Sequence, residues 1–212
     1  MIREDIREFL NTLPKDITLV AATKYAGLDD MKILLESGVH DFGENRVDSF
    51  LNKYDALQQC DVTWHFIGHL QRNKAKDVIN KIDYLHSLDS LKLAELINKE
   101  RTKPLKAFIE VSINGEDNKN GVPLADIDSF IDAVLKYPNI QLVGLMMMAV
   151  QGSDDQSLKN QFAQLRLLKE KLESKYKITL PYLSMGMSED YLIATKQGAT
   201  HIRLGRILFD NK

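Results

Sequence analysis

Ile17-Thr18-Leu19-Val20-Ala21-Ala22-Thr23-Lys24-Tyr25 is a short apolar run that ends on a lysine. Its β-branched and aliphatic side chains predict a buried strand, and residues 27–30 predict the start of a helix directly after it. Alternation along the strand places Val20, Ala22 and Lys24 on the same face. Lys24 therefore emerges at the carboxyl end of the strand, which is where ligands bind in parallel α/β folds.

The chemistry open to Lys24 depends on its surroundings. An amine held in a partly apolar pocket loses its proton more readily and then attacks a carbonyl carbon, as lysines that form Schiff bases do. The structural alternative is a lysine that merely extends its charged head into water from the end of a strand. The run alone does not separate the two interpretations, so the rest of the chain decides between them.

The composition is typical of a globular protein with 212 residues, which is enough for a sizeable α/β core. With 28 basic and 30 acidic residues the formal net charge is −2, and no bulk electrostatic argument favours nucleic acid or an anionic membrane. The single cysteine, Cys60, excludes an internal disulfide. No apolar run has the length of a membrane span, and the N-terminus lacks a signal-peptide core, so we expect a cytoplasmic protein.

Strands and helices alternate along the rest of the chain. The apolar runs predict strands at 17–24, 39–42, 63–67, 82–86, 106–113, 140–146, 182–183 and 200–204. Eight such units favour an α/β fold closed as a (β/α)₈ TIM barrel, with an open doubly wound sheet as the alternative. Residues 1–13 predict a short amphipathic N-terminal helix. Because no linker or repeat interrupts the pattern, we predict one domain over residues 1–212.

Polar side chains that follow the predicted strands are the candidates for a site, since a barrel binds ligands at that end. They are Lys24 and Tyr25; Glu44 and Asn45; His65, His69 and Asn73; the loop 114–121; Met146, Met147 and Met148; residues 184–188; and residues 203–206. The glycine turns at 184–188 and 205–206 each precede a predicted helix. Loops after the seventh and eighth strands of such barrels commonly bind phosphate through backbone N–H groups. Ordinary caps and turns are the alternative.

Neither a metal site nor a nucleophilic thiol is predicted. His65 and His69 lie four residues apart, but Gly68 between them breaks a helical two-histidine face. Cys60 has no base nearby in the sequence. The other histidines lie in or beside predicted strands, where structural roles are expected; they are His40, His86 and His201.

A set of motifs falls in one order along the chain and together resembles the pyridoxal phosphate homeostasis proteins. The motifs are Thr23-Lys24, Phe42-Gly43-Glu44-Asn45, Trp64-His65-Phe66-Ile67-Gly68, Leu70-Gln71-Arg72-Asn73-Lys74, Lys119-Asn120-Gly121, Gly144-Leu145-Met146, Leu183-Ser184-Met185-Gly186-Met187-Ser188 and Ile202-Arg203-Leu204-Gly205. The resemblance covers essentially the whole chain from about residue 17.

The resemblance implies a barrel of the fold-type III class, similar to the N-terminal domain of alanine racemase. It implies that pyridoxal 5'-phosphate (PLP) is held as a covalent aldimine on Lys24. It also implies further cofactor-binding residues: Arg203 at the pyridine nitrogen; Ser184 and the backbone of Gly205 and Arg206 at the phosphate, with Met185 and Ser188 as additional candidates; and Asn45 and His65 near the ring.

This arrangement favours a carrier over an enzyme. An arginine does not readily give up its proton, so a pyridine nitrogen facing it stays unprotonated and the ring is a poor electron sink. The resembling racemase also takes a second acid/base tyrosine from another domain, which this chain lacks. We therefore predict a non-catalytic, monomeric PLP-binding protein of vitamin B6 and amino-acid homeostasis, with PLP-requiring apo-enzymes as transient recipients and no catalytic or metal-binding residues.

Other functions stay open at this point. A weak PLP-dependent amino-acid racemase would need His65 or Tyr25 as its acid/base group, and a phosphate-ligand-binding barrel would not use PLP at all. A pure scaffold would leave the polar strand ends unexplained. Arg206 stands where many family members carry threonine, so its guanidinium either replaces a hydroxyl contact to phosphate or points outward. Arg46 and Asp48 also depart from the family pattern at the pocket rim.

Overall fold

The computed structural model describes residues 1–113 and 120–209. Its strands are β1 Thr18–Ala22, β2 Asp41–Glu44, β3 Thr63–Phe66, β4 Tyr84–Leu88, β5 Leu105–Ser112, β6 Val122–Pro123, β7 Ile140–Met146, β8 Tyr182–Ser184 and β9 His201–Leu204. Its helices are α1 Ile6–Thr12, α2 Leu28–Glu36, α3 Val47–Ala56, α4 Arg72–Val78, α5 Leu91–Glu100, α6 Ile127–Val134, α7 Asp155–Tyr176, α8 Tyr191–Lys196 and the 3₁₀ turn η1 Arg206–Leu208.

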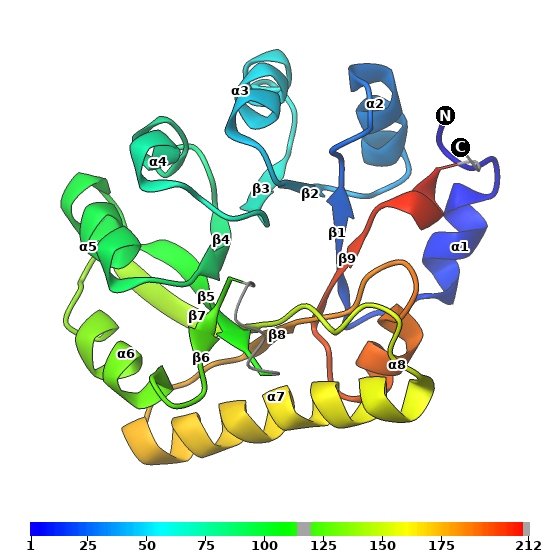
Figure 1. The fold of residues 1–212 in the computed structure, drawn as a ribbon. Helices are drawn as coiled ribbons and strands as arrows, with labels where there is room; N and C mark the ends of the chain where they lie inside the picture. The colour runs from blue at the N-terminus through cyan, green and yellow to red at the C-terminus, as the bar shows by residue number, and fades with distance from the viewer. Residues whose placement is uncertain (114–119, 210–212) are drawn as a thin grey trace.

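The sheet is parallel and closes on itself. Its strand order is β4-β3-β2-β1-β9-β8-β7-β5-β6, and an additional pairing of β4 with β5 completes a ring of eight strands. The two-residue strand β6 pairs only with the carboxyl end of β5. The helices surround the ring (Figure 1). The predicted (β/α)₈ barrel is confirmed, and the open doubly wound alternative is wrong because β4 and β5 pair.

Several elements differ from the prediction at their ends. The N-terminal helix begins at Ile6 because the residues before it pair with the other end of the chain: Ile2 forms an antiparallel bridge with Phe209. The second and fourth strands start two residues later than predicted and run further toward the site end. The motif residue Lys119 and most of the predicted loop 114–121 lie outside the described residues.

Aromatic and histidine rings fill the interior of the barrel. They are His65, Tyr84, His86, Phe108, Tyr182 and His201. His201 on β9 lies 5.2 Å from Phe108 on β5 and 6.0 Å from Tyr84 on β4, between ring centroids, so these contacts cross the lumen. The outward faces of the strands pack instead on the helices through residues such as Phe42 and Leu85, in a separate apolar cluster. Because histidine and tyrosine rings carry polar atoms, a core built from them needs hydrogen-bond partners within the barrel.

The close packing of β7 against β8 at Gly144 can be tested by substitution. A Cβ added at Gly144 would lie 2.0 Å from the backbone oxygen of Tyr182, so Gly144→Ala forces the two paired strands apart. We expect Gly144→Ala to lower the free energy of unfolding by about 2 kcal/mol or more, the scale of overpacking in a core. The control is Gly27→Ala, where the nearest atom to the new Cβ is 4.0 Å away. Denaturant unfolding of both variants measures the difference; equal stabilities would contradict this account of the packing.

Candidate functional site

Lys24 lies two residues beyond the end of β1, at the carboxyl end of the barrel, and is exposed. Its Nζ lies 4.7 Å from the centre of the Tyr25 ring, and Tyr25 itself is 78% exposed. Within the described residues Lys24 makes no ion pair. The amine is therefore presented to solvent at the barrel mouth, beside an aromatic face.

A buried ion pair fixes the backbone just before Lys24. Lys53, from α3, donates from Nζ to the backbone oxygen of Thr23 at 2.5 Å and to Glu44 Oε1 at 2.6 Å. The Thr23 hydroxyl donates to the same Glu44 oxygen at 2.5 Å. Because Glu44 and Thr23 are both fully buried, these bonds are shielded from water and hold the strand end where Lys24 leaves it. Glu44 was among the residues predicted at the site, whereas Lys53 was not, because it lies on a helix.

The glycine turns after β8 and β9 meet at Ser188. The Ser188 hydroxyl accepts from the N–H of Gly205 at 3.3 Å and from the N–H of Ile207 at 3.5 Å. Gly186 has φ +94°, and a Cβ there would lie 2.7 Å from the Ala194 Cβ, so only glycine fits this turn against α8. Two backbone donors thus converge on one point next to β1.

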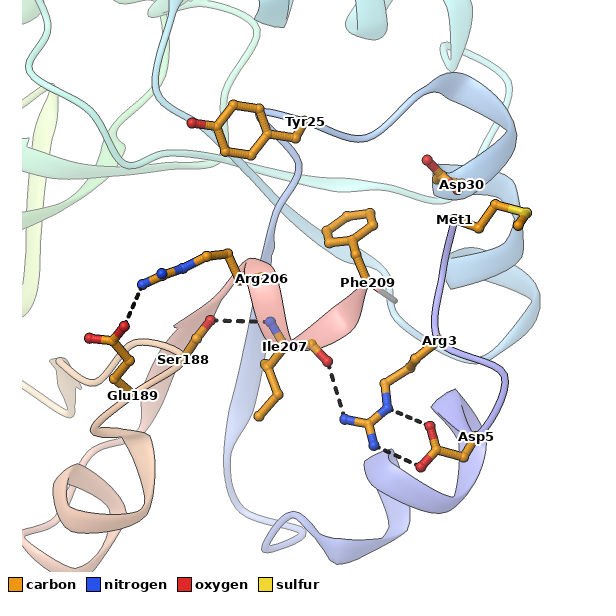
Figure 2. Close-up of a pocket in the computed structure, with 10 residues that line it drawn as sticks. All are labelled: Met1, Arg3, Asp5, Tyr25, Asp30, Ser188, Glu189, Arg206, Ile207 and Phe209. Atoms are coloured by element: carbon orange, nitrogen blue, oxygen red, sulfur yellow. Dashed lines mark hydrogen bonds and ion pairs between the residues drawn. The ribbon is translucent and has the colours of Figure 1, made fainter. Parts of the chain in front are cut away.

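An open pocket of about 990 Å³ joins this turn to the end of β1. Its walls include Tyr25, Ser188, Arg206 and Ile207, together with Met1, Arg3, Asp5, Asp30, Glu189 and Phe209 (Figure 2). The Arg206 guanidinium donates to Glu189 at 2.7 Å, and both side chains are more than 70% exposed. The side chain of Arg206 thus extends to the pocket rim, and the backbone of η1 faces Ser188.

Arg203 is a buried cation at the site end of β9. It is 5% exposed; Nη1 donates to Ser184 Oγ at 2.5 Å, and Nη2 donates to the backbone oxygen of Met147 at 2.9 Å. Burial lowers the pKa of Arg203 to about 10, while the charges of Glu110 and Asp190 oppose that shift. The guanidinium is therefore still charged near neutral pH and can only donate hydrogen bonds.

Glu110, at the site end of β5, is a titratable group that the sequence analysis missed. It is 3% exposed, and burial, followed by the charge of Asp89, raises its pKa to about 7, against opposing effects of Arg203 and His69. His69 Nδ1 lies 2.8 Å from Asp89 Oδ2. The sequence signal was available, since Glu110 is the one carboxylate in the apolar run 107–111.

The other predicted site residues lie in different environments. His65 is fully buried inside the barrel, stacked on Tyr84 with 4.6 Å between ring centres. Ser184 is also fully buried, Met185 packs in the apolar cluster outside the strands, and Asn45 is exposed after β2. The structure thus brings Lys24, Ser188 and Gly205 to one side of the mouth, with Arg203 and Ser184 below it.

No group of three or more histidine, cysteine, aspartate or glutamate side chains in the described part of the chain is arranged to hold a metal ion. Likewise, none of the helices described here combines the length and apolar character needed to cross a membrane.

Comparisons with known proteins agree with this fold. The family model of the alanine racemase N-terminal domain matches residues 1–211. A pyridoxal phosphate homeostasis protein of Aquifex aeolicus is 37% identical over 197 residues, which are 92% of this chain and 86% of that protein. Another, from Synechocystis, is 34% identical over 209 residues, 97% of this chain and 96% of that protein.

Solved structures give the same picture. PipY of Synechococcus elongatus, solved with PLP bound, is 31% identical and superposes with a TM-score of 0.91 over 97% of this chain and 100% of its own. Alanine racemase from Corynebacterium glutamicum shares the fold alone, at 14% identity, with a TM-score of 0.78 over 98% of this chain and 60% of its own.

Fold and site together define a barrel protein of the alanine racemase N-terminal-domain class, with a lysine at the end of its first strand. Within that class, the chain belongs to the family of the pyridoxal phosphate homeostasis proteins, as the resemblance in its motifs predicted.

The buried carboxyl of Glu110 makes a testable contribution to stability. Folded Glu110 keeps its proton up to about pH 7, whereas the unfolded group loses it near its ordinary pKa of 4.5. Since the folded state binds more protons between these values, the free energy of unfolding falls as pH rises across that window. At about 1.4 kcal/mol per pKa unit, the loss attributable to Glu110 is about 3 kcal/mol.

Glu110→Gln removes this titration, so the variant should lose about 3 kcal/mol less stability than the native chain as pH rises from about 4.5 to above about 7. The control is Glu8→Gln, which changes an exposed carboxyl on α1. Urea unfolding at a series of pH values provides the measurement. Parallel pH profiles for the native chain and Glu110→Gln would contradict the assignment.

Proposed function

We propose that this chain binds PLP covalently through Lys24 and holds it in cellular PLP and amino-acid homeostasis, as a carrier without efficient catalysis. The observation that carries the proposal is the arrangement on three neighbouring strands: Lys24 follows β1, Arg203 lies on β9, and the turn that includes Ser188 follows β8. Relatives named as PLP homeostasis proteins and the PLP-bound structure of PipY support it.

The residues present fit the three parts of the cofactor. Lys24 supplies an exposed primary amine, and Arg203 supplies a buried donor below the mouth. The N–H groups of Gly205 and Ile207 supply donors to an anion at the point where Ser188 now accepts from both. A Cβ at Gly205 would meet only Ala22, at 3.6 Å and 3.7 Å, so the glycine keeps the backbone beside β1 open to close approach.

PLP, when bound, would supply an aldehyde carbon with which the primary amine of Lys24 can condense, with loss of water. The chain's own residues do the rest. Glu44 and Lys53 fix the backbone from which Lys24 extends. Arg203, which can only donate, would face the pyridine nitrogen and leave it unprotonated. Ser188 and the backbone N–H groups of Gly205 and Ile207, with the backbone of Arg206 between them, would bind the phosphate. Asn45 borders the mouth, His65 and Ser184 lie buried in the lumen below it, and Met185 packs outside the strands.

The surroundings of the two acid/base candidates support a carrier over a racemase. His65 is fully buried, and both of its ring nitrogens already have hydrogen-bond partners. Tyr25 extends into solvent. A residual PLP-dependent proton transfer is the second candidate function, favoured by Glu110, whose pKa of about 7 suits a general acid or base. An assay of D- and L-alanine interconversion by the native chain and Glu110→Gln separates the two functions.

The proposal extends to the biological setting. We propose that residues 1–212 act as one cytoplasmic domain and as a monomer, and that PLP-requiring apo-enzymes receive the cofactor transiently. The mouth is open to such recipients, since Tyr25, Met148 and Met187 are all exposed there.

Lys24→Ala is the direct test. The native chain mixed with PLP should develop a Schiff-base absorbance near about 420 nm, and borohydride should trap the cofactor on Lys24. Lys24→Ala should show neither signal, because the only amine proposed to bond to the aldehyde is gone. Lys53→Ala is an unsuitable control since Lys53 is buried in an ion pair; Lys32→Ala, on the exposed surface of α2, is the matched one. A band that persists in Lys24→Ala would overturn the proposal.

Substitutions at Arg206 and Ser188 test whether the phosphate is bound by the backbone or by the Arg206 side chain. Its guanidinium is paired with Glu189 in solvent, where such pairs contribute little, so Arg206→Ala should change the dissociation constant for PLP by less than about threefold. In Ser188→Ala the phosphate loses the hydroxyl that would donate to it, so binding should weaken by about fivefold, the effect of one hydrogen bond. Spectroscopic titration gives both constants. A larger loss in Arg206→Ala would assign the phosphate contact to its side chain.

A further inference from the structure

A continuous chain of hydrogen bonds crosses the barrel lumen and ends at Arg203. Asp41 Oδ1 lies 2.9 Å from His65 Nε2, and His65 Nδ1 lies 2.9 Å from His86 Nε2. His86 Nδ1 lies 2.8 Å from Ser184 Oγ, which accepts from Arg203 Nη1 at 2.5 Å. Asp41 is the first residue of β2 and Ser184 the last of β8, so the chain connects the two ends of the barrel.

With neutral imidazole rings, the two ends of this chain fix the direction of every bond in it. A guanidinium only donates, so Ser184 Oγ accepts from Arg203; an ionised carboxylate only accepts, so His65 donates to Asp41 from Nε2. His65 Nδ1 is then an acceptor and His86 must donate to it from Nε2. His86 Nδ1 consequently accepts the Ser184 proton. Both rings carry their proton on Nε2, and all five groups are satisfied in one arrangement.

The charges around the chain favour this neutral arrangement. His86 is faced by titratable groups from β3 and β9, namely His65, His201 and Arg203, and by the Phe108 ring, which stacks on it with 4.3 Å between centres. Burial, together with the charges of those three groups, lowers the pKa of His86 well below its usual value. Burial likewise lowers the pKa of His201 to about 3. A second cation beside buried Arg203 is therefore disfavoured, and His86 stays an uncharged link.

We propose that Asp41, His65 and His86 are positioning residues for Arg203, which act through Ser184 to fix the orientation of its guanidinium at the site end of β9. The inference rests on the proposed function for the identity of the ligand, but the orientation of Arg203 is a property of the ligand-free chain. All three act on the ligand only through Ser184 and Arg203. Each fixes the direction of the next hydrogen bond, and the Asp41 carboxylate is the acceptor at which the chain of hydrogen bonds ends.

The test compares three variants of the full chain. His86→Phe keeps a flat ring against Phe108 and removes both hydrogen bonds, while Asp41→Asn keeps the shape of the terminal group and removes its charge. The matched control is His201→Phe: His201 lies in the same lumen, 4.7 Å from the Tyr182 ring centre, and its hydrogen bond goes to Thr200, outside the chain. Asp41→Asn, half-buried at the barrel end, serves as the second variant if His86→Phe does not fold.

Two measurements on ligand-free protein come first. Long-range proton–nitrogen NMR spectra near neutral pH should show the ring proton of both His65 and His86 on Nε2, with His86 uncharged. The guanidinium signals of Arg203 should shift and exchange faster with water in His86→Phe and Asp41→Asn, and stay unchanged in His201→Phe. An Nδ1–H or doubly protonated His65 or His86, or equal effects of His86→Phe and His201→Phe on Arg203, would overturn the proposal.

Titration with PLP then connects orientation to binding. We expect His86→Phe to raise the dissociation constant about tenfold, the loss of one charge-assisted contact, with a smaller rise in Asp41→Asn and none in His201→Phe. Unchanged affinity in His86→Phe, with Arg203 signals that do move, would overturn its role toward the ligand. If the native chain binds no PLP, the proposed function fails, and the Arg203 signals alone decide the positioning.

Discussion

The buried guanidinium of Arg203 is the constraint to which much of the barrel interior is adapted. A cation removed from water destabilises a fold by several kcal/mol unless hydrogen bonds and opposite charges compensate it. In this chain the Ser184 hydroxyl on β8 and the Met147 backbone oxygen after β7 accept its hydrogen bonds, and the charge of Asp190 opposes the lowering of its pKa. The lumen histidines connect Ser184 by hydrogen bonds to Asp41 at the far end of the barrel.

This adaptation explains why the lumen differs from a barrel core of branched aliphatic residues. Valine and isoleucine side chains cannot accept a hydrogen bond from the Ser184 hydroxyl, and they cannot link it by hydrogen bonds to the Asp41 carboxylate. Histidine rings stack on Tyr84 and Phe108 as flat apolar surfaces and also pass a hydrogen bond through their two nitrogens. The same rings therefore fill the interior and carry the hydrogen bonds that lead to the buried Arg203 guanidinium.

Much of the fold was predictable because its signals are local. Apolar runs and the breaks between them predicted the eight barrel strands, and the glycine turns after the last two predicted where backbone donors converge. Contacts that form only when the sheet closes into a barrel were not predictable from local sequence. His86 and Ser184 are 98 residues apart, and their contact exists only because the ring of strands brings β4 and β8 to opposite walls of one lumen.

The site residues that were not predicted are likewise defined by contacts between distant parts of the chain. Lys53 lies on the inner face of a helix, and no periodicity in the sequence says that its amine reaches the Thr23 carbonyl. Glu110 carried a signal, a carboxylate inside an apolar strand, but its meaning depends on Arg203 on β9 and on Asp89 directly after β4. The placement of His65 near the cofactor ring came from a family motif and stays a prediction, since strand alternation cannot say how deep in a barrel a residue lies.

Exposure at the mouth and burial below it have different consequences for the proposed ligand. A Schiff base at an open mouth stays accessible to water and to competing amines, so it exchanges readily; sites that drive carbanion chemistry exclude water. Lys24 and Tyr25 lie at the open rim, whereas Arg203 and Ser184 are sealed beneath it. Under the proposed function, the covalent bond on Lys24 would form where it is reversible, and the Arg203 charge is held where it is rigid. The proposed carrier needs this combination, since it must recognise the cofactor specifically and still release it.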